Sequence, residues 1–146
     1  MTVSIQYNIQ KEKNLIISLW HHNVTFDQWM NNVKKLIVEP DFKQAVKQIV
    51  DIHIGSADIS IGQEEIKQVV DFIAQHPEVI LGRKIAIVAG KEFNRSSFFT
   101  QLARSQFLNA IVFNDLQTAC KWLGVDRQEA EVSIERIRKE LQQETQ

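Results

Sequence analysis

The chain has 146 residues, of which 44% are hydrophobic and 24% are charged, and its formal net charge at pH 7 is -1. This composition is that of a globular protein long enough to bury a core, which excludes a disordered chain and favours a single domain by length. The near-zero charge excludes the basic excess typical of nucleic-acid-binding proteins, and no apolar run approaches the roughly 20 residues of a transmembrane segment.

The first predicted elements are two strands and a helix. Apolar residues at positions 3, 5, 7 and 9 alternate with polar ones, which is the period of a half-buried strand. A polar turn at 11–14 separates it from the apolar run at 15–20, and so short a connection implies an antiparallel hairpin. Thr25 then caps a helix, with Gln28 as its capping-box partner, and apolar residues recur at helical spacing as far as Ile37.

Strands and helices alternate along the rest of the chain. A third strand is expected between residues 45 and 54, and the next helix starts either at Ser60 or at Gly62. The elements that follow are a strand at 84–89, a helix at 92–106, a strand at 109–113, and a short helix capped by Asp115 and ended by Gly124. This alternation predicts an α/β fold with a parallel sheet covered on both faces.

A last helix is expected from Asp126 onward, with Glu129 as the partner in its capping pair. Its apolar residues are spaced four, three and four apart and form a narrow seam on an otherwise charged helix: Ala130, Ile134, Ile137 and Leu141. This seam either packs on the chain's own domain or joins the same helix of a second subunit as a dimer seam. We therefore divide the chain into a domain at 1–124 and a C-terminal helical extension at 125–146.

Catalytic and metal-binding patterns are missing from the sequence. The histidines at positions 21, 22, 53 and 76 include no pair at helical i, i+4 spacing, and we expect no metal site. Neither a Gly-x-Ser-x-Gly elbow nor a phosphate-binding loop is present, so we expect no catalytic residue, no cofactor and no enzymatic activity. A single cysteine, Cys120, and a start unlike a signal peptide suit a cytoplasmic protein.

The loop at residues 55–62 is the best candidate for a ligand or partner site. It connects the third strand to a helix at the carboxyl end of the sheet, where open α/β folds place their ligands. Its polar side chains are Ser56, Asp58 and Ser60, beside the free backbone amides that start the helix. The alternative is that these residues serve only helix capping and turn formation.

A resemblance to a known family is carried by the run at 15–20, Val24-Thr25-Phe26-Asp27-Gln28-Trp29, Ile49-Val50-Asp51-Ile52, Gly82-Arg83-Lys84-Ile85-Ala86-Ile87-Val88, and the segment from Val112 to Gly124. With these stretches, the pattern of residues 3–124 resembles the STAS-like family of small bacterial proteins of unknown function, which are similar in fold to anti-sigma-factor antagonists. The resemblance implies a single mixed β-sheet of about five strands, with an N-terminal antiparallel hairpin, βαβ units and helices packed on it. The C-terminal helix is an addition to that pattern.

The resemblance also bears on function. Anti-sigma-factor antagonists are switched by phosphorylation of a serine in an Asp-Ser-Ser-Gly motif, and Asp58-Ile59-Ser60-Ile61-Gly62 stands in about that place, with Ile59 and Ile61 as departures. The first interpretation is therefore a non-catalytic regulatory or protein-interaction module that binds a protein partner or itself.

The alternative follows from the similarity of the fold to CRAL-TRIO lipid-binding domains. It is a binder or sensor of a small apolar, lipid-like or anionic ligand. The pocket wall expected for that ligand consists of Phe93, Phe98, Phe99, Leu102 and Phe107.

Overall fold

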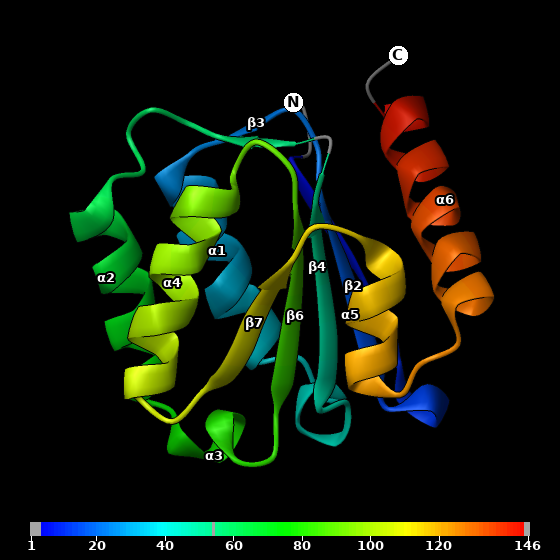
Figure 1. Ribbon diagram of the computed structural model, residues 1–146, viewed down its shortest axis with the longest axis horizontal. Helices are drawn as coiled ribbons and strands as arrows, with labels where there is room; N and C mark the ends of the chain where they lie inside the picture. The colour runs from blue at the N-terminus through cyan, green and yellow to red at the C-terminus, as the bar shows by residue number, and fades with distance from the viewer. Residues whose placement is uncertain (1–3, 54, 145–146) are drawn as a thin grey trace.

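The computed structural model describes residues 4–53 and 55–144 and shows one five-stranded sheet flanked by helices (Figure 1). The strands of this sheet, in spatial order, are β1 (Ile5–Gln10), β2 (Leu15–Trp20), β4 (Lys47–Ile52), β6 (Lys84–Ala89) and β7 (Asn109–Phe113). β1 pairs antiparallel with β2, and every other neighbouring pair in this sheet is parallel. The predicted α/β fold, with its N-terminal hairpin and mixed sheet, is confirmed.

Helices cover both faces of the sheet. α1 (Phe26–Ile37), α2 (Gln63–Ala74) and α4 (Phe93–Ser105) lie on one side, which we call the three-helix face. α5 (Leu116–Leu123) and α6 (Arg127–Glu144) lie on the opposite side, the two-helix face. None of the described helices is long and apolar enough to cross a membrane.

Local capping signals position the helices as the sequence indicates. The Gln28 backbone N–H donates to Thr25 Oγ1 at 3.2 Å, and the Thr25 N–H donates to Gln28 Oε1 at 2.9 Å, which completes the predicted capping box. Of the two proposed starts for α2 the structure has the one at Gly62, the N-cap residue of that helix. Gly124 ends α5 with a φ of 71°, a left-handed conformation that glycine adopts without strain.

Several short elements were not predicted. β3 (Asn23–Val24) and β5 (Ser56–Ala57) form a small parallel pair beyond the main sheet, and α3 (Pro77–Ile80) precedes β6. Two 3-10 turns, η1 (Lys11–Lys13) and η2 (Phe42–Gln44), precede β2 and β4. A two-residue strand carries no periodicity in the sequence, and only its pairing with a distant segment defines it.

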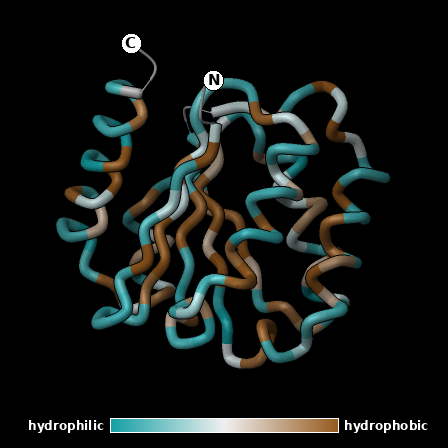
Figure 2. The backbone as a smooth tube through the Cα atoms, turned by 180° about the vertical axis from the view of Figure 1, so that it is seen from behind, coloured by the Kyte–Doolittle hydropathy of each residue, from teal (hydrophilic) through white to brown (hydrophobic). Residues whose placement is uncertain are grey.

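The C-terminal seam is buried inside the chain. Ala130, Ile134, Ile137 and Leu141 are at most 4% exposed and pack in one core with Leu15, Ile17 and Leu19 of β2 and with α5. Figure 2 shows the strands as the hydrophobic centre of the molecule and α6 as a mainly hydrophilic helix beside them. Of the two predicted arrangements, the structure therefore shows the one in which the seam packs on the chain's own domain. These four side chains are covered without a second subunit.

Candidate ligand-binding cavity

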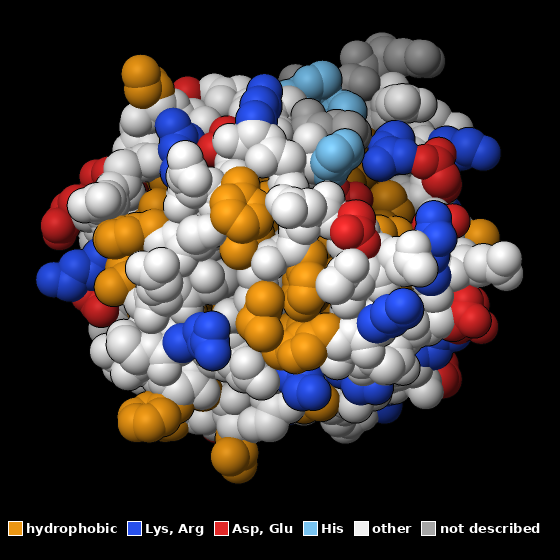
Figure 3. Space-filling view, in the orientation of Figure 1, with side chains coloured by type: hydrophobic (Ala, Val, Ile, Leu, Met, Phe, Trp, Pro, Cys, Tyr) orange, Lys and Arg blue, Asp and Glu red, His pale blue; other side chains and the backbone are white. Residues whose placement is uncertain are grey.

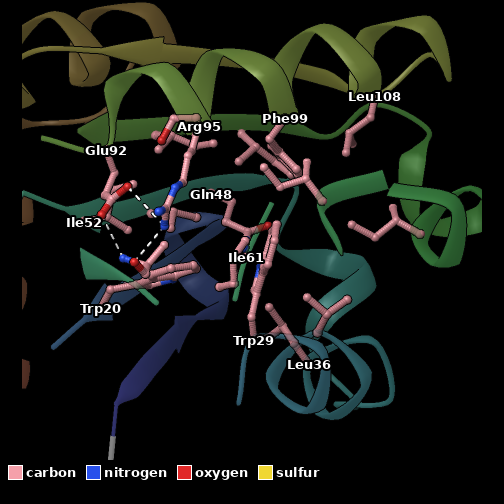
Figure 4. A pocket seen from close by; sticks show the side chains of 18 of the residues that line it. Trp20, Trp29, Leu36, Gln48, Ile52, Ile61, Glu92, Arg95, Phe99 and Leu108 are labelled. Carbon is pink, nitrogen blue, oxygen red and sulfur yellow. Dashed lines mark hydrogen bonds and ion pairs between the residues drawn. The ribbon is translucent and has the colours of Figure 1, made fainter. Parts of the chain in front are cut away.

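An apolar cavity of about 120 Å³ lies on the three-helix face (Figure 4). It lies between the sheet and helices α1, α2 and α4, and its wall is mostly aliphatic and aromatic. Residues that represent the apolar wall are Trp20, Trp29, Val50, Ile87, Phe99 and Leu108. Cavities with an apolar wall and a few polar groups are typical of small-molecule sites, so this is our candidate functional site.

Three aromatic rings form one side of the cavity. The rings of Trp20 from β2 and Trp29 from α1 are 5.7 Å apart between centroids in an edge-to-face arrangement. Trp29 also lies 5.7 Å from the ring of Phe99 in α4. Such tilted contacts stabilise a fixed arrangement of rings. They connect the sheet with two of its covering helices, and Figure 4 shows these side chains together in the pocket.

The polar groups at the carboxyl end of the sheet clamp the loop at 55–62, which we call the cover loop. The Glu92 carboxylate accepts the Ala57 N–H at 2.9 Å, and Arg95 donates to the carbonyl oxygens of Ala57 at 2.7 Å and Asp58 at 3.0 Å. Glu92 and Arg95 also form an ion pair at 3.6 Å. The clamp holds Ala57 and Ile61 of the cover loop in the cavity wall.

A buried arginine lies in the cavity wall near the amino ends of the strands. Arg83, 2% exposed, donates from Nε to the carbonyl oxygen of Val79 and from Nη2 to that of Phe42. Its Nη1 donates to the Ala45 carbonyl at 3.0 Å and to Gln48 Oε1 at 3.4 Å. The guanidinium stacks 3.8 Å from the centre of the Phe42 ring. Burial lowers the pKa of Arg83 to about 10, so the side chain stays charged at neutral pH.

The residues predicted from the cover loop lie outside the cavity wall. Ser56 Oγ donates to Asn23 Oδ1 at 3.3 Å, and Asn23 Nδ2 donates to Asp58 Oδ1 at 2.5 Å. The Ser60 N–H donates to Asp58 Oδ2, and hydrogen bonds from Ser60 and Asn23 lower the pKa of Asp58 to about 2. The Ser56 and Asp58 side chains bind Asn23 of β3, and the Ser60 N–H closes the turn on Asp58, as in the turn-forming alternative.

The predicted aromatic pocket wall is wrong except at one position. Phe99 lines the cavity, but Phe107 is 89% exposed and Phe93 is 37% exposed. Phe98 and Leu102 are partly buried against the same core and do not line the cavity. The helical repeat of α4 places Phe99 on the sheet-facing side with Arg95 and Ser96, and it directs the other large residues elsewhere.

Sequence reasoning missed the polar residues of the cavity, although two of them left a signal. Arg83 is a charged residue at the start of an apolar strand, and Gln48 interrupts the apolar positions of β4. Both look like ordinary strand-end residues until η2 and α3 close over them. Glu92 and Arg95 read as solvent-exposed helix residues, because their partners come from the distant cover loop.

The two-helix face contains the other notable polar residue. Asp51 is buried in β4, accepts the His53 N–H at 2.9 Å, and has its pKa raised by burial. Histidine side chains gather at one end of the molecule in Figure 3. Within residues 4–53 and 55–144, however, no group of three or more His, Cys, Asp or Glu side chains has a geometry that could hold a metal ion.

Comparison with known proteins identifies the fold. No protein-family model and no curated protein matches this chain. A solved structure of an uncharacterised protein of the DUF3478 family, with a SpoIIAA-like fold, from Shewanella loihica PV-4 is similar to it, with a TM-score of 0.52 at 12% sequence identity. The similarity covers 82% of this chain and 94% of that chain. The predicted STAS-like, anti-sigma-factor-antagonist-like fold is thereby confirmed as a likeness of fold.

Proposed function

We propose that this protein is a non-catalytic binder of a small apolar ligand, which it holds in the cavity of the three-helix face. The observation that carries the proposal is the cavity itself. Its wall is almost entirely apolar, and a ligand that fills the space would remove this surface from water and gain packing contacts with it.

The volume limits the size of the ligand. Apolar cavities of about 150 Å³ bind benzene, so a cavity of 120 Å³ suits a molecule of similar size or a short alkyl chain. Among the lipid-like ligands expected from the sequence, this favours short molecules over complete membrane lipids. The aromatic wall of Trp20, Trp29 and Phe99 adds contact area at fixed positions and needs no rearrangement to receive them.

A titration with 1-hexanol tests the proposal directly. We expect saturable binding by calorimetry and a rise in melting temperature with ligand concentration, because a ligand that binds only the folded state stabilises it. Val50→Phe projects a ring into the cavity and should abolish binding. Val132→Phe is the matched control, since Val132 is 58% exposed on α6 and should leave binding unchanged. Failure of the unaltered protein to bind 1-hexanol would overturn the proposal.

A second candidate function, self-association, is favoured by the edge strand β7. This strand ends the sheet order, and its sequence Asn109-Ala110-Ile111-Val112-Phe113 contains no charged residue and no proline, the usual protection of an exposed edge. Hydrophobic side chains also gather near the centre of the surface in Figure 3.

The molecular mass of the protein in solution tests whether it self-associates through β7. A dimer that becomes monomeric in Ile111→Lys, with unchanged helix content, would support pairing through β7. Leu81→Lys is the control, because Leu81 is 84% exposed and lies outside β7, in the turn before β6. A monomeric native protein at micromolar concentration would remove self-association and leave the ligand proposal intact.

A further inference from the structure

The end of the cavity near the amino ends of the strands carries a positive charge that the described part of the chain does not neutralise. Arg83 is 2% exposed, and no carboxylate among residues 4–53 and 55–144 lies within ion-pairing distance of it. Its acceptors are three backbone carbonyls and the Gln48 amide oxygen, all of them neutral. Buried charges in proteins are ordinarily paired with an opposite charge. Arg83 is an exception, and it faces a cavity.

The same end of the cavity has unused hydrogen-bond donors. A guanidinium has five N–H groups, and four of those of Arg83 have acceptors within the described residues. One N–H on Nη2 has none. The Gln48 side chain gives its oxygen to Arg83, and its Nε2 group is a second kind of N–H donor at the cavity wall. Because both residues line the cavity, a ligand there meets a cation and two kinds of N–H donor.

We propose that the ligand is a small apolar carboxylate, whose carboxylate group pairs with Arg83 and Gln48 while its apolar body lies against the aromatic wall. This inference rests on the proposed function, since it assumes that the cavity takes up a ligand. It adds the chemical class of that ligand and its orientation. The charged group lies at the amino ends of the strands, on the side of the cavity opposite the Glu92–Arg95 clamp.

The fold has already met the main cost of such binding. Arg83 is desolvated and held by four hydrogen bonds before any ligand arrives, so little reorganisation is needed at the moment of binding. Hydrogen bonds between a guanidinium and a carboxylate are about twice as strong as neutral ones. A neutral ligand of equal size forgoes that gain, and an ammonium group is repelled by the buried charge.

Three ligands of equal chain length test this inference. We expect hexanoate to bind at least about tenfold more tightly than 1-hexanol, and hexylamine to bind most weakly, in calorimetric titrations at one pH and ionic strength. Equal affinities for hexanoate and 1-hexanol would overturn the carboxylate inference and leave the proposed function standing. Binding of neither would overturn both.

An isosteric variant makes the test specific to the site. Gln48→Glu places a carboxylate where Oε1 lies 3.4 Å from Arg83 Nη1, so the protein supplies its own anion. We expect the ratio of hexanoate affinity to 1-hexanol affinity to fall at least about tenfold. Gln101→Glu, on an exposed position of α4, is the matched control and should change neither affinity. An unchanged ratio in Gln48→Glu would overturn the inference.

Arg83→Met provides a second variant in which the cation is removed and most of the side-chain volume is kept. If it folds, as judged by circular dichroism, hexanoate should lose its advantage over 1-hexanol. A retained advantage contradicts the assignment of the carboxylate to Arg83. If the lost bonds to three carbonyls prevent folding, the Gln48→Glu comparison and the ligand series decide the question.

Discussion

The two faces of the same sheet are packed in different ways. On the two-helix face, Leu15, Ile17, Leu19 and Ile49 are at most 2% exposed and interlock with α5 and α6. On the three-helix face, the same strands border a cavity of about 120 Å³. Because both faces belong to the same strands, we attribute the difference in packing to the side chains that lie between the sheet and its helices.

Small helix residues lie in the filled core of the two-helix face, whereas large rings border the cavity of the other face. Ala119 of α5 and Ala130 of α6, both almost fully buried, let these helices approach the sheet. Trp20, Trp29 and Phe99 form a row of rings between the sheet, α1 and α4. We infer that the two-helix face supplies stability and that the three-helix face gives up part of it for binding.

The largest expected effect comes from placing charges in the filled face. Ile134→Asp together with Ile137→Asp should lower the free energy of unfolding by more than about 4 kcal/mol, because two carboxylates would enter an apolar core. Chemical unfolding followed by circular dichroism measures the loss. Val132→Asp, on the exposed side of the same helix, should stay within about 0.5 kcal/mol of the native value.

One result would contradict the packing of the seam within the chain. If the double variant kept its stability but had half the native mass in solution, the seam would lie between subunits.

A smaller effect is expected from Asp51, the buried acid of the two-helix face. Burial raises its pKa, so the folded state holds the proton more tightly than the unfolded state does, and stability falls as the pH rises above about 4. Asp51→Asn should remove this decline and raise stability at neutral pH. The gain is limited, because Arg138 and the His53 N–H already favour the charged form.

Unfolding by urea at a series of pH values measures this difference. Asp71→Asn, at an exposed position of α2, is the control and should leave the pH profile of the native protein unchanged. Parallel profiles for Asp51→Asn and the native protein would contradict the assignment of the penalty to Asp51.

An added methylene group should have opposite effects on the two faces. Val50→Ile extends a side chain into the cavity and should stabilise the protein by about 0.8 kcal/mol. Val88→Ile, on the neighbouring strand, extends a 4% exposed side chain into the filled core and should destabilise it by about 1 kcal/mol. If the two variants changed the unfolding free energy of the native protein in the same direction, the contrast between the faces would be refuted.

The smallest effect is expected in the cover loop. Ser60→Glu should change stability by less than about 0.5 kcal/mol and leave 1-hexanol affinity unchanged, because Ser60 is exposed and its backbone N–H makes the bond to Asp58. Calorimetry and thermal unfolding check both values. A clear loss of 1-hexanol affinity in this variant would show that Ser60, one of the residues predicted from sequence, acts on the cavity after all.

The fold could be predicted because its signals are local. Thr25 and Gln28 lie three residues apart, Asp115 caps α5 through the N–H of Thr118, and the alternating residues of β1 pair with β2 across a short turn. Each signal depends on neighbours in the chain, so it can be read without knowing where distant segments lie. The resemblance of residues 3–124 to the STAS-like family extended these local predictions to the architecture of the whole sheet.

The site could be predicted only in part, because its groups meet through packing. The cover loop was identified from its place after a parallel strand, but the residues that reach the cavity are Ala57 and Ile61, not the polar residues beside them. The ligand-facing role of Arg83 depends on η2, α3 and β4 closing around it. These contacts come from distant segments, so the sequence near Arg83 shows only a charged residue at the start of an apolar strand.

The sequence by itself determined the five strands of the main sheet, the longer helices and their order, since these follow from side-chain periodicity and backbone capping. Only the tertiary structure decided that the seam of α6 is covered within the chain, and that bulky rings leave a cavity on one face. Only the tertiary structure also showed that a buried arginine in that cavity has no carboxylate partner in the described chain. Those outcomes depend on the volumes and charges of side chains from distant segments, which meet only when the sheet has formed.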